Sequence, residues 1–432
     1  MKVHLSALGC RLNEAELEQW AADFTQAGYI LSDSAGDADV MVMNTCAVTR
    51  EAVAKSRRKL NRLQRENPAA KLVVSGCYSS LESSASLAEL GVDLVVPNTD
   101  KDRLVPLTHQ AFADAAMPEG ATQPDGAPLF RRNRHRAFIK IQDGCRYRCT
   151  FCIVTVARGP ERSRQISEIL NEVRALHKDG VREIVLTGVH VGGYGHELDT
   201  DLATLVRALL AETEMERIRF ASVEPWDLSP DFFDLFVNPR VQPHMHLPLQ
   251  SGCDSVLKRM ARRCKTKDFA NLTRTLYETE PGFNVTTDII TGFPGESDAE
   301  WRQTMDFIRT QAFGHIHVFT YSEREGTKAA NLPDSVPLAV RQIRSRELRT
   351  LADELRNSRL QAAIGETVSV LWERGKRITL DKGGEGWQHA GYTPNYLKVC
   401  TTSSNNLANQ ILPTLITSLD TNLLWGRTTA TD

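Results

Sequence analysis

The sequence predicts an α/β protein with an N-terminal parallel α/β domain, a central partial β/α barrel and a small C-terminal antiparallel β-barrel. Over most of the chain, short apolar segments alternate with polar helical ones, which is typical of parallel sheets covered by helices. After residue 364 the pattern changes to short β-rich stretches separated by Gly, Asn and Asp, which favours an antiparallel barrel. A chain of 432 residues is also too long for one ordinary core.

The first predicted domain covers residues 1–110. Strands are expected at residues 3–8, 40–44, 71–75 and 94–96, and helices at residues 14–26 and 53–66. A stretch rich in Ala, Gly and Pro at residues 115–128 predicts a linker, which we place at residues 111–130.

Three cysteines of this domain each follow a predicted strand: Cys10, Cys46 and Cys77. The carboxyl ends of parallel strands lie along one edge of a sheet, so these side chains are expected to converge. A single free cysteine is more often a small buried apolar residue. The same setting repeated three times instead predicts a shared iron-sulfur site.

The second predicted part covers residues 131–360 and repeats the order strand, loop, helix. Its strands are expected at residues 138–141, 184–186, 217–220, 244–246, 285–290 and 315–319. Each strand leads into a polar or Gly-rich loop, and an Arg-rich amphipathic helix closes the part. In a β/α barrel, functional residues gather at the carboxyl ends of the strands. Such residues alone could be core histidines or turn glycines, but their common placement predicts a lined cavity.

The loop after the first barrel strand contains the spacing C-x3-C-x2-C, formed by Cys145, Cys149 and Cys152. Three thiolates are one fewer than the four that fill an iron-sulfur cube, so one iron is left open. The alternative is a zinc knuckle, which needs a fourth ligand. The nearest histidine, His135, lies ten positions upstream, so the sequence favours the cluster.

The third predicted part, residues 361–432, has expected strands at residues 368–372, 391–399 and 411–419. Tyr392, Tyr396 and Lys398 form an aromatic and basic set of the kind that stacks on bases and binds phosphates. The alternative is that these aromatic rings belong to the barrel core.

Basic residues are clustered, although the net charge is only −2. The runs are Arg57, Arg58, Lys59, Arg62 and Arg65; Arg131, Arg132, Arg134 and Arg136; Lys258, Arg259, Arg262, Arg263, Lys265 and Lys267; and Arg341, Arg344, Arg346 and Arg349. One such run is usually a solvated helix face. Four runs favour a polyanionic partner, and Arg262 or Arg263 could bind a phosphate or carboxylate in bidentate fashion.

Targeting and redox signals point to the cytoplasm. No apolar run approaches the roughly 18 residues of a membrane span, and the N-terminus reads as a strand and not as a signal peptide. Nine cysteines in an unexported chain are expected to be free thiols or metal ligands.

Residues 140–145 and 152–159, together with Gly9-Cys10, Asn44-Thr45-Cys46 and Gly76-Cys77, resemble the radical S-adenosylmethionine (SAM) methylthiotransferases. The resemblance implies two 4Fe-4S clusters, one on Cys145, Cys149 and Cys152 that binds SAM, and an auxiliary one on the other three cysteines. SAM is then both methyl donor and radical source. The resemblance further implies that the cofactor pocket is lined by Thr187, Gly188, Ser222, Glu224, Gln250 and Asp288.

The third part resembles the TRAM domain, an RNA-binding barrel. Residues 186–195 and 391–396 look most like the subfamily that inserts a methylthio group at C2 of N6-threonylcarbamoyladenosine next to the anticodon. The implied partners are the tRNA anticodon stem-loop and a reducing donor such as flavodoxin or ferredoxin. Alternatives are isopentenyladenosine in tRNA, a ribosomal-protein aspartate, or a non-catalytic iron-sulfur RNA sensor. Thr155 and Cys264 depart from the family pattern without touching an expected ligand.

Overall fold

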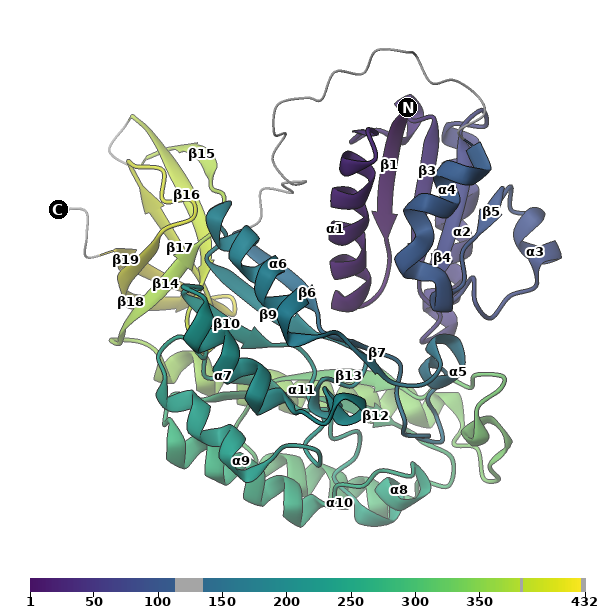
Figure 1. Ribbon diagram of the computed structural model, residues 1–432. Coiled ribbons are helices and arrows are strands. Elements are labelled where there is room, and N and C mark those ends of the chain that lie inside the picture. Colours follow the sequence, from purple (N-terminus) through teal and green to yellow (C-terminus); the bar gives the residue numbers. More distant parts are fainter. Residues whose placement is uncertain (113–134, 381–383, 429–432) are drawn as a thin grey trace.

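The computed structural model describes residues 1–112, 135–380 and 384–428, so the predicted linker at residues 115–128 lies outside the described residues. The N-terminal sheet and the C-terminal sheet flank the central barrel (Figure 1). This arrangement confirms the predicted fold class. No helix within the described ranges is long and apolar enough to span a membrane.

The N-terminal domain is a five-stranded parallel sheet in the order β2-β1-β3-β4-β5. The central strand β3 is buried along its whole length, which explains its continuous apolar sequence. The short elements β2, α3 and α4 were not predicted. The bounds are β1 (Lys2–Ala7), α1 (Arg11–Gln26), β2 (Ile30–Leu31), β3 (Val40–Thr45), α2 (Arg50–Glu66), β4 (Lys71–Gly76), α3 (Ser84–Ala88), β5 (Leu94–Val95) and α4 (Leu104–Phe112).

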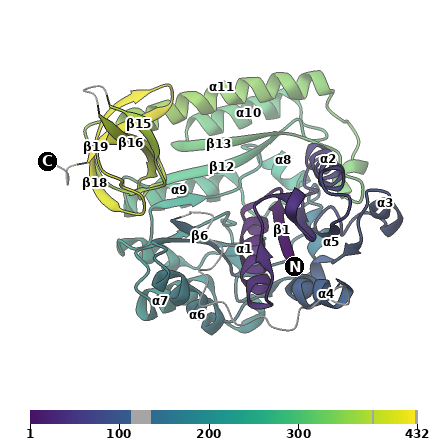
Figure 2. The same ribbon diagram turned by 90° about the horizontal axis from the view of Figure 1, so that it is seen from above.

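The central part consists of two three-stranded parallel sheets, β10-β9-β6 and β11-β12-β13. Parallel bridges from Ile218 to Val241 and from Ser222 to His246 join them into one open barrel (Figure 2). All six predicted strands are present: β6 (Arg136–Lys140), β9 (Glu183–Thr187), β10 (Arg217–Phe220), β11 (His244–His246), β12 (Asn284–Thr291) and β13 (Phe313–Thr320).

Helices cover the outer face of this barrel, and their apolar sides form the largest core cluster of the molecule. They are α6 (Ile166–Lys178), α7 (Leu202–Glu212), α8 (Asp254–Arg259), α9 (Thr266–Thr279), α10 (Asp298–Arg309) and the long α11 (Leu338–Ala362). In the last of these, Arg341 and Arg344 are buried and paired with Glu323 and Glu296, so this basic run does not present its first two arginines to a polyanion.

The C-terminal sheet has the order β14-β18-β19-β17-β16-β15, and a further pairing of β14 with β16 closes it. Its pairs are antiparallel except β17 with β19. The single strand predicted at residues 391–399 is wrong, because Tyr396 has a φ of +65° and turns the chain between two strands. The bounds are β14 (Thr367–Trp372), β15 (Lys376–Thr379), β16 (Glu385–Tyr392), β17 (Lys398–Ser403), β18 (Ile411–Asp420) and β19 (Leu423–Thr428).

Polar contacts fasten the C-terminal barrel to the central one. Arg217 Nη1 donates to the Tyr392 carbonyl at 3.0 Å, and Arg219 Nη1 donates to the Pro394 carbonyl at 2.9 Å. Helix α1 of the N-terminal domain lies against β6 on the other side. The three parts therefore share one concave region.

Candidate active site

The three N-terminal cysteines follow neighbouring strands of one sheet, as the sequence predicts. Register places Ala7 of β1 beside Asn44, and Thr45 of β3 beside Gly76. Cys46 and Cys77 come directly after those strands, and Cys10 directly precedes α1. The structure therefore brings Cys10, Cys46 and Cys77 to one edge.

Two glycines permit this close approach. Gly9 has a φ of +110°, and a Cβ there would lie 2.9 Å from Cys46 Sγ. Gly76 has a φ of +105°, and a Cβ there would lie 2.3 Å from the Thr45 carbonyl oxygen. The positive φ and the lack of room for a Cβ both require glycine at these two positions, each immediately before a cysteine.

Burial governs the electrostatics of these thiols. Desolvation raises the pKa of Cys46 to about 11 and also raises the pKa of Cys10, although Cys10 reaches solvent through a pocket. The positive charge of Arg158 opposes the shift at both thiols. Ionising these thiols in a desolvated site is unfavourable. A metal that replaces their protons would offset that unfavourable free energy, because the thiolate is the metal-binding form.

The second cysteine set lies on the loop between β7 (Gln142–Asp143) and the short α5 (Val154–Arg158). The Cys152 amide donates to the Cys149 carbonyl at 3.0 Å, and the Tyr147 amide donates toward Cys145 Sγ at 3.4 Å. Gly144 has a φ of +71°, and a Cβ there would lie 1.9 Å from the Pro160 carbonyl oxygen. Desolvation raises the pKa of Cys145 to about 12 and raises that of Cys152.

Glu224 and Arg262 adjoin this loop. Arg262 Nη1 lies 3.8 Å from Cys149 Sγ, and its guanidinium lies 4.2 Å from the centre of the Trp226 ring. Desolvation raises the pKa of Glu224, and its Oε2 accepts no hydrogen bond from any described residue. The same oxygen lies 3.7 Å from Nε2 of His190. A half-buried carboxylate with a free hydrogen-bond acceptor beside the cysteine loop fits the ammonium group of an amino-acid ligand.

His190 is a buried residue of the site that the sequence did not single out. Its Nδ1 pairs with Glu161, and its Nε2 lies 2.7 Å from Asp227. These carboxylates outweigh the effect of burial and raise the pKa of His190. Cys145, Glu161 and His190 lie close enough to suggest a metal site, but both ring nitrogens already have carboxylate partners.

The zinc alternative requires a histidine beside the cysteine loop. His135 lies instead near Asn409 of the C-terminal barrel, which opposes the lowering of its pKa by burial. The donor set at each site is therefore three thiols that adjoin buried polar groups, which fits a cluster with one open iron.

A cavity of about 570 Å³ connects the three parts, and we call it the barrel pocket. Cys10 lies at its wall, as do Thr187, Gly188 and Ser222 from the predicted cofactor set. Gln250 and Asp288 do not line it. Asp288 Oδ1 lies 3.2 Å from Nε2 of His246, which does line the pocket.

The predicted RNA-binding residues fall into two groups. Tyr392 and Tyr396 stack at 4.8 Å and line the barrel pocket with Lys398. Arg262 lies beside the cysteine loop instead, and the exposed Arg263 covers the Tyr147 ring at 4.6 Å. The two tyrosines lie at the seam between barrels, where Arg136 and Arg219 contact the Tyr396 ring.

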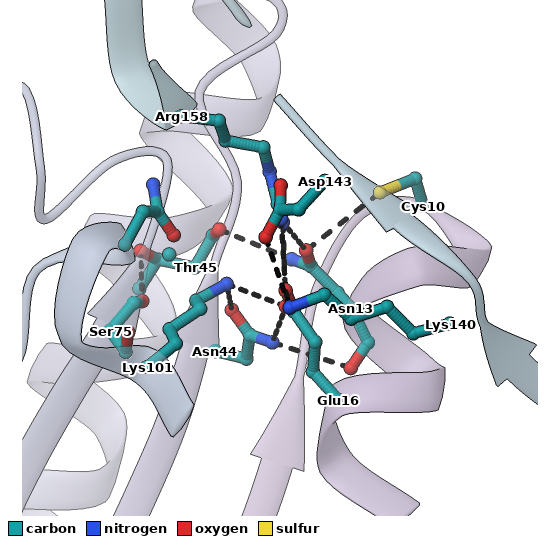
Figure 3. A network of polar contacts seen from close by, with 12 residues as sticks. Cys10, Asn13, Glu16, Asn44, Thr45, Ser75, Lys101, Lys140, Asp143 and Arg158 are labelled. Carbon is teal, nitrogen blue, oxygen red and sulfur yellow. Dashed lines mark hydrogen bonds and ion pairs between the residues drawn. The ribbon is translucent and has the colours of Figure 1, made fainter. Parts of the chain in front are cut away.

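A buried polar network, which we call the Arg158 network, links Asn13, beside Cys10, to Asp143 and Arg158, which stand on either side of the second cysteine set in the sequence (Figure 3). Arg158 donates to Asn13 Oδ1, Glu16 Oε1 and Asp143 Oδ1, each at 2.9 Å. Its remaining members are Asn44, Lys101 and Lys140. The sequence offered one signal: Glu16 stands on the apolar stripe of α1 between Leu12 and Trp20.

Comparison with known proteins agrees with this geometry. Residues 139–308 match the radical SAM superfamily, and residues 2–97 match the uncharacterized protein family UPF0004. The threonylcarbamoyladenosine tRNA methylthiotransferase MtaB of Bacillus subtilis (strain 168) is 34% identical over 95% of this chain and 92% of its own length.

A second relative, the tRNA-2-methylthio-N(6)-dimethylallyladenosine synthase of Parafrankia sp. (strain EAN1pec), is 36% identical over 85% of this chain and 77% of its own length. Among solved structures, the radical SAM methyltransferase TsrM from Kitasatospora setae aligns with a TM-score of 0.58 at 16% identity, covering 76% of this chain and 77% of that one. That likeness supports the fold. The chain belongs to the radical SAM methylthiotransferases, transferase enzymes that use SAM and two 4Fe-4S clusters.

Proposed function

We propose that this enzyme inserts a methylthio group at C2 of N6-threonylcarbamoyladenosine next to the anticodon of tRNA, in the cytoplasm. The product is 2-methylthio-N6-threonylcarbamoyladenosine. The substrates are a tRNA anticodon stem-loop and SAM, with electrons from a flavodoxin or ferredoxin. The observation that carries the proposal is the charge of the barrel pocket.

The pocket is lined by four permanently cationic side chains and, among the described residues, by no carboxylate. Arg219 pairs with Glu183, a carboxylate that it shares with Arg136 and Arg217, and Arg11 pairs with Glu14. Arg356 and Lys398 have no ion-pair partner within the described residues. Burial lowers the pKa of His244 and that of His315, the latter to about 4, so both rings are neutral at pH 7.

Positive charge without an ion-pair partner at the pocket wall favours an anionic base. Threonylcarbamoyladenosine carries a carboxylate, whereas the isopentenyl group is a hydrocarbon. We infer that Arg356 and Lys398 receive the threonyl carboxylate, because a charge-assisted bond inside a pocket is stronger than one in water. Tyr392 and Tyr396 provide a stacking surface for the neighbouring bases.

The residues around each cysteine set have separable roles. We assign Cys145, Cys149 and Cys152 to the SAM-binding cluster, and Cys10, Cys46 and Cys77 to the auxiliary cluster. When bound, these groups supply one-electron reduction of SAM and the sulfur, chemistry that no side-chain base offers at a non-acidic adenine carbon. Glu224 binds the SAM ammonium group, Arg262 holds the cysteine loop, and the pocket walls orient adenine C2 toward Cys10 and exclude water.

The first test is mass spectrometry of nucleosides from bulk tRNA, compared in cells with and without the gene. Loss of 2-methylthio-N6-threonylcarbamoyladenosine with accumulation of its precursor is the expected result. An unchanged profile would refute the proposal. Loss of the isopentenyl product instead would assign the enzyme to the other tRNA substrate.

A second test asks whether the enzyme recognises the threonyl carboxylate of the substrate. Purified enzyme is given stem-loops whose threonyl group carries either the natural carboxylate or a neutral carboxamide. Arg356→Gln and Lys398→Gln are expected to reduce turnover of the carboxylate substrate about tenfold and to leave the carboxamide nearly unaffected. Arg349→Gln, elsewhere on α11, is the matched control. Equal losses on both substrates would refute the assignment of these two residues.

A further inference from the structure

The Arg158 network lies between the two cysteine sites and is buried. Arg158 and Lys101 are each 1% exposed, and Glu16 and Asp143 are each 3% exposed. Its ion pairs are short: Lys101 Nζ to Glu16 Oε2 is 2.5 Å, and Lys140 Nζ to Asp143 Oδ2 is 3.0 Å. Arrangements of this kind are costly to assemble, because each charge must leave water.

The charges of the network do not cancel. Three cations (Lys101, Lys140 and Arg158) face two anions (Glu16 and Asp143), which leaves one net positive charge. Within the described residues, Arg162 and Asp102 also approach the network, at 3.9 Å and 3.7 Å, but both side chains are substantially exposed. Arg162 and Asp102 carry opposite charges, so they leave the net charge of the network unchanged.

One of those neighbours is the auxiliary cysteine site. Asn13 Oδ1 accepts from Arg158 Nη2 at 2.9 Å and lies 3.7 Å from Cys10 Sγ. The amide is held in this orientation because Asn13 Nδ2 donates to the carbonyls of Leu8 and Thr45, at 2.6 Å and 3.2 Å. Figure 3 shows the Asn13 side chain between Arg158 and Cys10.

A cluster held by three thiolates is net negative, because the thiolate charges outweigh that of the oxidised core. The reduction potential of such a cluster depends on nearby charge and hydrogen bonds.

We propose that Arg158, the last residue of the helix that follows the SAM-cluster loop, is a positioning residue for the auxiliary cluster, and that the net positive charge of its network raises the reduction potential of that cluster. This rests on the assignment of Cys10, Cys46 and Cys77 as cluster ligands and is independent of which nucleoside is modified. It gives the otherwise costly network a function and links the two cofactor sites through one guanidinium.

The test is a redox titration of the full-length protein with both clusters reconstituted, using dithionite as the electron donor and electron paramagnetic resonance as the readout. A chain with Cys145, Cys149 and Cys152 replaced by Ala identifies the signal of the auxiliary cluster. Arg158→Gln is expected to shift that midpoint potential to more negative values, because addition of an electron is no longer favoured by the charge. Arg158→Lys is expected to stay close to the unmodified protein.

The sign of a second variant separates charge from structural damage. Glu16→Gln removes a negative charge from the same network and is expected to shift the potential in the opposite direction. Arg162→Gln, on a half-exposed side chain beside Asp143, is the matched control and is expected to have a much smaller effect. Shifts of the same sign in Arg158→Gln and Glu16→Gln, or no shift in either, would overturn the proposal.

Folding is monitored by circular dichroism and by iron content per chain. If Arg158→Gln does not fold, Lys140→Gln replaces it, because this side chain is 17% exposed and its loss leaves Arg158 in place. The proposal then requires Lys140→Gln and Glu16→Gln to shift the midpoint potential in opposite directions. Shifts of the same sign, or no shift in either variant, would overturn it.

Discussion

Glu183 anchors the seam between the central and C-terminal barrels. It is fully buried on β9, bonds Arg219 through both carboxylate oxygens at 3.2 Å, and pairs with Arg136 and Arg217. Those three arginines in turn hold Tyr392, Tyr396 and the turn between β16 and β17. Glu183→Gln would leave three buried arginines facing a neutral amide.

The expected cost follows from the titration of this carboxyl. Desolvation would raise its pKa, but Arg219, Arg136 and Arg217 lower it from 4.5 to about 2. At about 1.4 kcal/mol per pKa unit, this separation corresponds to about 3 kcal/mol. Removal of one partner from a buried ion pair costs a similar amount.

Hydrogen-deuterium exchange measures this loss locally. We expect amides of β9, β10 and β16 to exchange roughly a hundredfold faster in Glu183→Gln, since about 1.4 kcal/mol is a factor of ten. The matched control is Glu216→Gln at the start of β10, where the carboxylate is 33% exposed and pairs with Arg182. Its expected cost is below about 1 kcal/mol. Acceleration of less than fivefold in Glu183→Gln would refute the reasoning.

The pH dependence of stability provides an independent check that the charged form of Glu183 stabilises the fold. A carboxyl with a lowered folded pKa stabilises fully above its unfolded pKa and loses that contribution as pH falls toward the folded value. The stability difference between the unmodified protein and Glu183→Gln is therefore expected to be constant from pH 7 to about 4.5 and to shrink between about 4.5 and about 2. A difference that shrinks already near pH 6 would assign the effect to another group.

Three further predictions concern the cysteine sites and RNA. Cys149→Ala is expected to abolish formation of 5′-deoxyadenosine from SAM, whereas Cys10→Ala is expected to keep that cleavage and stop sulfur insertion; equal loss of cleavage would contradict the division of labour. Gly144→Ala is expected to reduce iron to about half, because the added Cβ meets the Pro160 carbonyl oxygen at 1.9 Å and displaces one cysteine set. Arg263→Gln, at an exposed side chain, is expected to lower the slope of log affinity for tRNA against log salt by about one; an unchanged slope would exclude a phosphate contact.

Sequence pattern was sufficient for the six barrel strands and for the placement of Cys10, Cys46 and Cys77, because hydrophobic period and strand-end position are local properties. It failed at residues 391–399, where apolar and aromatic residues on both sides of a turn read as one strand. The positive φ of Tyr396 depends on packing against His244 and Arg219, which are distant in sequence. Tertiary contact decided that conformation.

The Arg158 network was invisible for the same reason. Lys101 and Arg158 are ordinary polar residues in the sequence, and only the tertiary fold brings them to Glu16, Lys101 from within the N-terminal domain and Arg158 from α5 of the central part. The sequence did not single out His190 for the same reason, since its carboxylate partners come from separate loops. Charged residues on apolar faces, such as Glu16, are the one signal that a sequence gives for a network of this kind.

The rigid seam of the C-terminal barrel bears on how this module can be exchanged between enzymes. Because Arg217 and Arg219 donate to its main-chain carbonyls and Tyr396 forms part of the pocket wall, the barrel is not an appendage on a tether. A chimera that receives a foreign barrel must reproduce the turn between β16 and β17. A protein truncated after α11 would lose part of the wall of the barrel pocket.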